Sequence, residues 1–317
     1  ASNSERDPSL GLESILAIGG PGAGARPSFE GPMGVAYGSE GRMYVTDSAN
    51  NRVCVFSTRG RFLFEFGRFG VAKPLPGGKR SWEPGRLNYP LGIDVDEDGT
   101  VYVADFRNDC VEVFDSEGRF IRRFPDPSRR VGKGSSGQDG TGIAVTDVAV
   151  RNGRVYATDA YQILVFSTDG KLLEQFGRPG SGAADLDHPN GIAVAPNGTV
   201  YVSDSNHNRV TAFSPARAVL WTAGAPLGYS KAERPESLGL PRGLTVLDDG
   251  NILVADALNF ELVLISPEGR ILGRYGDVGA EAGRLGLPND VDANGSDLAV
   301  AEKGNDRVQV VRLTDPR

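Results

Sequence analysis

The chain has 317 residues, and its 41 acidic residues against 34 Lys and Arg give a formal net charge of −7 at pH 7. This charge disfavours nucleic acid as a general surface partner, because binding phosphates needs positive charge. No run approaches 18 uninterrupted apolar residues, so the sequence predicts no membrane-spanning helix. With 43 Gly and 20 Pro, about a fifth of the chain, it favours many short strands joined by turns.

The first predicted element is a lone strand at about residues 12–20, LESILAIGG, followed by a complete four-strand pattern. The later patterns, except the last, read as four strands too, for example GIAVAPNG, TVYVSD, RVTAF and a last short strand. Turns rich in Gly, Asn and Asp separate these strands. After RVQVVRL, at residues 307–313, the last pattern lacks its fourth strand. We therefore expect the N-terminal strand to complete the last unit.

An acidic residue ends the second strand of every unit, and these six marker acids lie 45 to 58 residues apart: Asp47, Asp105, Asp159, Asp204, Asp256 and Glu302. A four-stranded unit cannot bury both of its faces alone, so neighbouring units must cover each other. The sequence therefore predicts an all-β fold, a six-bladed β-propeller that forms a single domain over residues 1–317. The N-terminal strand would close the ring with the sixth blade.

Four motifs recur in order through the chain: P-x-G-[IV]-x-V, G-x-[VM]-Y-V-x-D, N-x-R-V-x-V-F and G-x-x-x-x-x-F-G. From about residue 12 to 313 this pattern resembles the NHL repeat family of six-bladed propellers. The resemblance implies the fold, but NHL-like propellers include RNA-binding and protein-binding modules, extracellular sensor domains and a metal-dependent amidating lyase. Those lyases hold zinc with three histidines, whereas this sequence contains only His188 and His207.

The repeated polar residues are interpreted as structural. A marker acid can accept backbone N–H bonds from the loop that follows it, and every blade has the same need. Arg52, Arg209 and Arg307 are expected to bind neighbouring loops. Cys54 and Cys110 lie in apolar strands without the spacing of a metal site, and we expect them to be buried free thiols.

A ligand site is expected where the innermost strands begin, because six side chains converge there on the channel. The position after the proline, or its equivalent, is occupied by Met33, Leu91, Thr146, Asn190, Arg242 and Asn289. At the next position most blades carry Gly, but the third and sixth carry Asp147 and Asp290. We expect these two aspartates to face each other across the channel, with Asp94 and Asp292 one step deeper. Pairing of aspartates with arginines, together with water, would fill this space.

An alternative interpretation places calcium among the channel oxygens, the only cofactor that the sequence suggests. A weaker resemblance, to gluconolactonase and regucalcin-like propellers, implies ligands at Glu30 in FEGP and Asn190 in HPNG. Asp147 and Asp290 would complete such a metal site, and the protein would then be a metal-dependent hydrolase or lactonase. Arg242, however, stands where that resemblance implies an acidic ligand, and its charge would oppose a cation.

Three long connections are expected on the face with the channel mouth: residues 68–89, 125–143 and 224–241. They carry Arg80, Trp82, Arg129 and Arg130, which together could form a basic docking sector or an ordinary solvated surface. The main hypothesis is a non-enzymatic scaffold that binds a protein or a small anionic ligand through these residues and through Arg242, Asn190 and Asn289. Single-stranded RNA binding is a further alternative, disfavoured by the net charge. We expect a monomer located outside the cytoplasm or secreted, with a cytoplasmic protein as the alternative.

Overall fold

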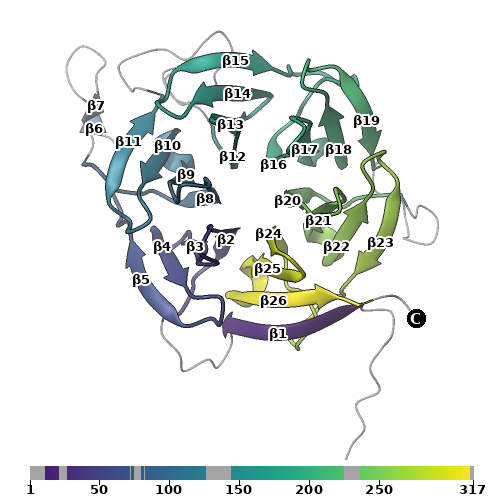
Figure 1. Cartoon of the computed structure of the whole chain (residues 1–317), viewed down its shortest axis with the longest axis horizontal. Coiled ribbons are helices and arrows are strands. Elements are labelled where there is room, and N and C mark those ends of the chain that lie inside the picture. Colours follow the sequence, from purple (N-terminus) through teal and green to yellow (C-terminus); the bar gives the residue numbers. More distant parts are fainter. Residues whose placement is uncertain are drawn as a thin grey trace, which may run out of the picture.

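A computed structural model describes residues 11–20, 27–71, 73–74, 80–81, 83–125, 144–224 and 236–314. Six four-stranded antiparallel sheets surround a central channel as the blades of a propeller (Figure 1). The predicted fold class is therefore confirmed. No helix in the described part of the chain is long and apolar enough to cross a membrane.

The blades are numbered in chain order, and their strands run from the channel outward. Blade 1 holds β2 (Pro32–Tyr37), β3 (Met43–Asp47), β4 (Arg52–Phe56) and β5 (Phe62–Phe66); blade 2 holds β8 (Pro90–Val95), β9 (Val101–Asp105), β10 (Cys110–Phe114) and β11 (Phe120–Phe124). Blade 3 holds β12 (Val148–Arg151), β13 (Arg154–Asp159), β14 (Gln162–Ser167) and β15 (Leu172–Phe176); blade 4 holds β16 (Pro189–Val194), β17 (Val200–Asp204), β18 (Arg209–Phe213) and β19 (Val219–Ala223).

Blade 5 holds β20 (Pro241–Val246), β21 (Ile252–Asp256), β22 (Glu261–Ile265) and β23 (Ile271–Tyr275); blade 6 holds β24 (Pro288–Asn294), β25 (Asp297–Glu302), β26 (Arg307–Leu313) and β1 (Leu12–Gly19). A short hairpin, β6 (Lys73–Pro74) with β7 (Arg80–Ser81), lies in the connection between blades 1 and 2. One-turn 3-10 helices follow the marker acid in four blades: Phe106–Asn108, Ser205–His207, Ala257–Asn259 and Lys303–Asn305.

The ring closes through the N-terminal strand, as predicted. β1 pairs antiparallel with β26, with Leu12 opposite Leu313 and Gly19 opposite Arg307. In Figure 1 the purple N-terminal strand lies beside the yellow C-terminal strand. This pairing removes the open edge that blade 6 would otherwise present on its outer side.

The hydrophobic core consists of six clusters, each shared by two neighbouring blades. Between blades 6 and 1, for example, Val45 and Phe56 pack with Ala299 and Val308. On the other side of blade 1, Val53 belongs to the cluster shared with blade 2. The alternating strand pattern thus sends apolar side chains to both neighbours, which explains why a single blade would not be stable alone.

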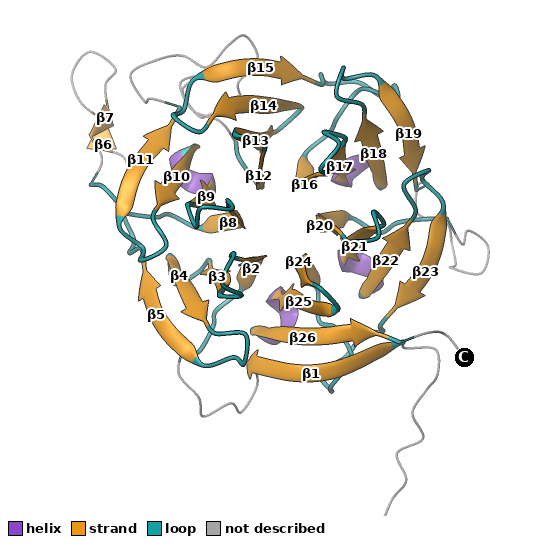
Figure 2. Cartoon of the chain, viewed as in Figure 1, coloured by secondary structure: helices purple, strands orange, loops and turns teal. Residues whose placement is uncertain are grey.

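The disc has two different faces. The innermost strands begin on the loop face, which also carries the connections between blades, such as residues 177–188 and 276–287. They end on the turn face, where turns such as residues 38–42 and 195–199 lead into the second strands. Figure 2 shows the innermost strand of every blade facing the centre of the ring.

Candidate functional site

The marker acids anchor the segments that lead into the blades. Asp47 accepts the N–H of Glu30 at 2.8 Å, and Asp204 accepts that of Asp187 at 2.8 Å. Each of the other four accepts an equivalent N–H from 15 to 17 residues upstream. The structural interpretation is therefore confirmed, and the expected backbone donor from the following loop occurs in blade 3, where Ala160 donates its N–H to Asp159 at 3.1 Å. The recurring backbone donor precedes the innermost strand instead of following the acid, because the second strand ends on the loop face beside the incoming segment.

The repeated arginines also bind neighbouring loops, as expected. Arg52 contacts the carboxylate of Asp47 at 2.8 Å and donates to the carbonyl of Ser28 at 3.0 Å. Arg209 joins Asp204 to the carbonyl of Asp185 in the same manner. These side chains thus tie the loop face to the marker acids.

Blade 2 departs from this pattern in a way that the sequence analysis missed. Cys110 occupies the arginine position, and ligand atoms of Asp105, Cys110 and Glu112 lie within 4.8 Å of one another in the interior. Burial raises the pKa of Asp105 to about 7 and that of Glu112 to about 8. Arg123 from the outermost strand pairs with Glu112 at 2.6 Å and supplies the compensating charge. Cys54 and Cys110 are buried free thiols, as expected.

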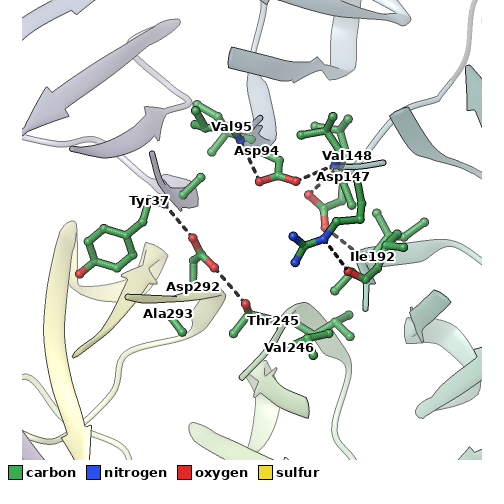
Figure 3. A pocket seen from close by; sticks show the side chains of 18 of the residues that line it. Tyr37, Asp94, Val95, Asp147, Val148, Ile192, Thr245, Val246, Asp292 and Ala293 are labelled. Carbon is green, nitrogen blue, oxygen red and sulfur yellow. Dashed lines mark hydrogen bonds between the residues drawn. The ribbon is translucent and has the colours of Figure 1, made fainter. Parts of the chain in front are cut away.

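A cavity of about 290 Å³ occupies the channel toward the turn face. It is lined by the later residues of the innermost strands and includes all four aspartates that were predicted to share the channel: Asp94, Asp147, Asp290 and Asp292. Figure 3 shows Asp94, Asp147 and Asp292 around this space. Seven carboxyl groups and one guanidinium, that of Arg151, belong to its lining residues.

The first two aspartates bridge neighbouring blades through backbone N–H groups. Asp147 of blade 3 accepts the N–H of Ile192 in blade 4 at 2.9 Å. Asp94 of blade 2 accepts the N–H of Val150 in blade 3 at 2.7 Å. An innermost strand has no partner strand on its channel side, so these carboxylates satisfy donors that would otherwise lack one.

Blade 6 repeats the arrangement on the opposite side of the ring. Asp290 accepts the N–H of Val35 in blade 1 at 2.9 Å, and Asp292 accepts that of Tyr37 at 2.7 Å. Asp292 also accepts the hydroxyl of Thr245 in blade 5 at 2.9 Å. Among the described residues no arginine lies within ion-pair distance of these four carboxylates. The expected pairing of aspartates with arginines is therefore wrong, because backbone donors of the adjacent blade lie closer.

Burial shifts the protonation of this cluster toward the neutral form. It raises the pKa of Asp94 to about 7 and that of Asp147 to about 8. Burial also raises the pKa of Asp290 well above its ordinary value, and repulsion from Asp147 adds to that shift. The pKa of Asp292 is raised by burial as well. Near neutral pH the cavity thus carries less negative charge than its number of carboxyl groups indicates.

These shifts predict an unusual dependence of stability on pH. Above about pH 4 the unfolded carboxyls have lost their protons, whereas the folded Asp94 and Asp147 keep theirs until the pH rises through about 7 and about 8, so raising the pH over this range favours unfolding. We expect the melting temperature to fall from pH 5 to pH 8, and to fall less steeply in the double variant D94N/D147N. Equal slopes for the two proteins in pH-dependent thermal melts would contradict the assignment.

The other predicted site residues occupy different places. Asn190, Arg242 and Asn289 lie at the loop-face end of the channel and do not line the cavity. Of the four residues considered as a metal site, only Asp147 and Asp290 line it, whereas the exposed Glu30 and the half-buried Asn190 do not. The structure therefore does not gather that ligand set around one space.

The predicted basic docking sector lies largely beyond the described residues. Trp82, Arg129 and Arg130 fall outside them, and Arg80 is placed only as part of β7. An aromatic side chain of the same connection, Tyr89, is described by the structure. Tyr89 precedes the proline that opens β8, and the guanidinium carbon of Arg107 lies 4.5 Å from the centroid of its ring.

Both histidines belong to blade 4. The Nδ1 atom of His188 lies 2.5 Å from a carboxylate oxygen of Asp187, and that of His207 lies 2.7 Å from one of Asp204. Since Asp204 is the marker acid of its blade, His207 takes part in the structural network described above.

Comparison with known proteins supports the repeat assignment. The family described as NHL repeat matches residues 29–56, 87–114 and 186–213, the three inner strands of blades 1, 2 and 4. Over 186 residues the chain is 29% identical to "Peptidyl-glycine alpha-amidating monooxygenase A" of Xenopus laevis, covering 56% of this chain and 18% of that protein. Over 165 residues it is 28% identical to "Protein brain tumor" of Drosophila melanogaster, covering 50% of this chain and 14% of that protein. The matched region thus spans less than a fifth of either relative.

Solved structures resemble the whole propeller. Virginiamycin B lyase from Staphylococcus aureus has a TM-score of 0.61 at 13% identity, covering 95% of this chain and 99% of that one. A gluconolactonase from Xanthomonas campestris has a TM-score of 0.59 at 17% identity, covering 90% and 87%. At these identities the likeness concerns the fold alone.

Proposed function

We propose that this chain, a six-bladed propeller with NHL repeats, is a non-enzymatic scaffold that binds a protein partner or a small anionic ligand through its loop face. The fold supplies a rigid disc, and the marker acids with their arginines fix the segments that enter each blade. Such preorganisation reduces the entropy lost when a partner binds.

The distribution of exposed apolar side chains carries the proposal. Five of them stand in connections of the loop face: Phe69, Val71, Tyr161, Leu258 and Val278. The other large apolar side chains that are exposed within the described ranges lie on outermost strands, and none of them lies in a turn-face connection. Exposed apolar groups gathered on one face favour an interaction surface there. From the sequence, the basic residues Arg80, Arg129 and Arg130 are expected on the same face.

The test compares two double variants that remove similar apolar area. F69S/L258S alters the loop face, whereas I121S/L220S alters outermost strands. We expect at least a tenfold weaker affinity for a purified partner in the first variant and an unchanged affinity in the second, measured by surface plasmon resonance. A charge-reversal variant, R80E/R129E/R130E, should weaken binding as well. Equal affinities for all of these proteins would refute the loop face as the binding surface.

The carboxyl-lined cavity favours a second candidate, a channel metal-dependent hydrolase. Asp147 and Asp290 would hold the ion, whose role would be to polarise a substrate carbonyl and activate water. Their oxygens already accept backbone N–H groups, so they fit an ion poorly. Elemental analysis with a thermal melt in chelator tests it: the scaffold proposal expects no stoichiometric metal and no shift of the melt. One bound ion whose removal destabilises the protein would favour the hydrolase instead.

Two further expectations belong to the proposal. We place the scaffold outside the cytoplasm or in the secreted fraction, which cell fractionation with an antibody would test. Binding to single-stranded RNA is the remaining alternative, and its affinity would fall steeply with salt concentration. The proposal expects no such binding at physiological ionic strength, because the net charge is −7.

A further inference from the structure

Arg242 occupies an unusual position at the loop-face end of the channel. It follows Pro241 at the start of β20 and is half-buried. Within the described part of the chain its guanidinium makes no ion pair and no side-chain hydrogen bond, whereas Arg52 and Arg209 pair with carboxylates. Burial without a partner lowers the pKa of Arg242, because the charged form loses hydration.

A second arginine, Arg107, lies on the same face of the disc. Tyr89 precedes β8 in blade 2, and Figure 1 shows β8 across the channel from β20. Tyr89 and Arg242 thus stand at the loop-face ends of two opposite innermost strands, and Arg107 lies against the Tyr89 ring. Arg107 is exposed and makes no ion pair with any described residue. Two guanidinium groups and one phenol therefore lie at this end of the channel, and neither guanidinium pairs with a carboxylate from the described ranges.

The residues beside Arg242 leave this charge uncompensated. Asn190 and Asn289 hold the same position in blades 4 and 6, and both side-chain amides are turned to backbone carbonyls. Asn190 donates to the carbonyl of His188 at 3.1 Å, and Asn289 donates to that of Met33 at 2.8 Å. Neither supplies negative charge, so an unpaired guanidinium remains costly to desolvate unless a ligand pairs with it.

We propose that Arg242, Tyr89 and Arg107 form a receptor for the carboxylate group of an organic acid at the loop-face end of the channel. Arg242 would bind both oxygens through its planar fork, Tyr89 would donate its hydroxyl, and Arg107 would add longer-range attraction. One half-buried guanidinium matches the single charge of a carboxylate better than the double charge of a phosphate. The inference rests on the proposed function, because it names the ligand chemistry of the same face.

The test measures binding of succinate to the full chain by calorimetry and thermal melting. We expect succinate to raise the melting temperature of the wild type, with at least tenfold weaker binding in R242M and severalfold weaker binding in R107Q. Without ligand, R242M should melt no lower than the wild type, because the substitution removes an unpaired charge. R119Q, which removes an exposed arginine on the outermost strand side of blade 2, is the matched control and should bind like the wild type.

Several results would overturn the inference. The inference fails if succinate does not bind, or if R242M binds succinate as tightly as the wild type does. It also fails if inorganic phosphate or neutral succinamide binds as tightly as succinate, or if R242M without ligand melts at a lower temperature than the wild type. If R242M does not fold, unchanged binding in R107Q and R242K decides against it. An acidic peptide that binds while succinate does not would assign the carboxylate to a protein and refute a free acid. F69S/L258S should retain succinate binding, so a failure of partner binding remains distinguishable.

Discussion

A chain lacking residues 1–20 is expected to lose about 5 kcal/mol of unfolding free energy and to melt on the order of 8 °C below the full chain. The deletion removes β1, whose Leu16 and Ile18 pack in the cluster between blades 6 and 1 and whose Leu12 packs in the cluster between blades 5 and 6. It also leaves β26 as an open edge along the pairing that closes the ring. The measurement is thermal and denaturant unfolding monitored by circular dichroism.

Deletion of residues 1–10 alone provides the control, because those residues precede β1. We expect that shorter deletion to leave the melt unchanged. A chain without residues 1–20 that melts like the full chain would show that the ring does not depend on this strand. Increased self-association of the longer deletion would be consistent with the exposed edge.

Substitution of alanine for Gly92 or Gly243 is expected to cost about 3 kcal/mol each, because both positions face a channel aspartate without spare room. A Cβ at Gly92 would lie 2.7 Å from the Cα of Asp147 and would collide with its carboxylate. A Cβ at Gly243 would lie 2.7 Å from the Cα of Asp290 and meet its carboxylate likewise. The backbone must shift, which would break the bridges to Ile192 and Val35.

Gly153 serves as the control for this pair of substitutions. It lies in a turn with φ of +69°, and a Cβ there meets nothing within 4 Å. G153A should therefore cost only the backbone strain of about 1 kcal/mol. Denaturant melts of G92A, G243A and G153A give the comparison. Similar losses in all three would mean that the contact between glycine and aspartate does not hold the blades together.

Much of the fold could be predicted because its determinants are local or repeated. The alternation within a run such as TVYVSD specifies a strand, and the recurring marker acids count the blades. The missing fourth strand after residue 313 and the lone strand at residues 12–20 together indicated the closure. At the second position after the proline of the innermost strand, or its equivalent, four blades carry glycine and the other two carry Asp147 and Asp290. This difference correctly predicted that both aspartates lie in the channel.

Other features of the site could not be predicted because they depend on contacts between blades. Sequence patterns do not reveal which backbone N–H approaches a carboxylate. The donors for Asp94 and Asp292 therefore could not be predicted, and neither could the position of the cavity near the turn face. The charge of Glu112 is compensated by Arg123, which lies on another strand. The repeat motif does not indicate that the arginine of this blade comes from there.

What the sequence by itself determined is the repeating unit, the number of units and the strand that closes the ring. Only the tertiary structure decided which polar groups meet: it directed the channel aspartates to the next blade. It also set β8, which Tyr89 precedes, across the channel from β20, which contains Arg242. The physical reason is that hydrophobic periodicity acts between residues close in the chain. Polar pairing across the ring depends instead on its closed geometry, which brings together residues that no sequence spacing connects.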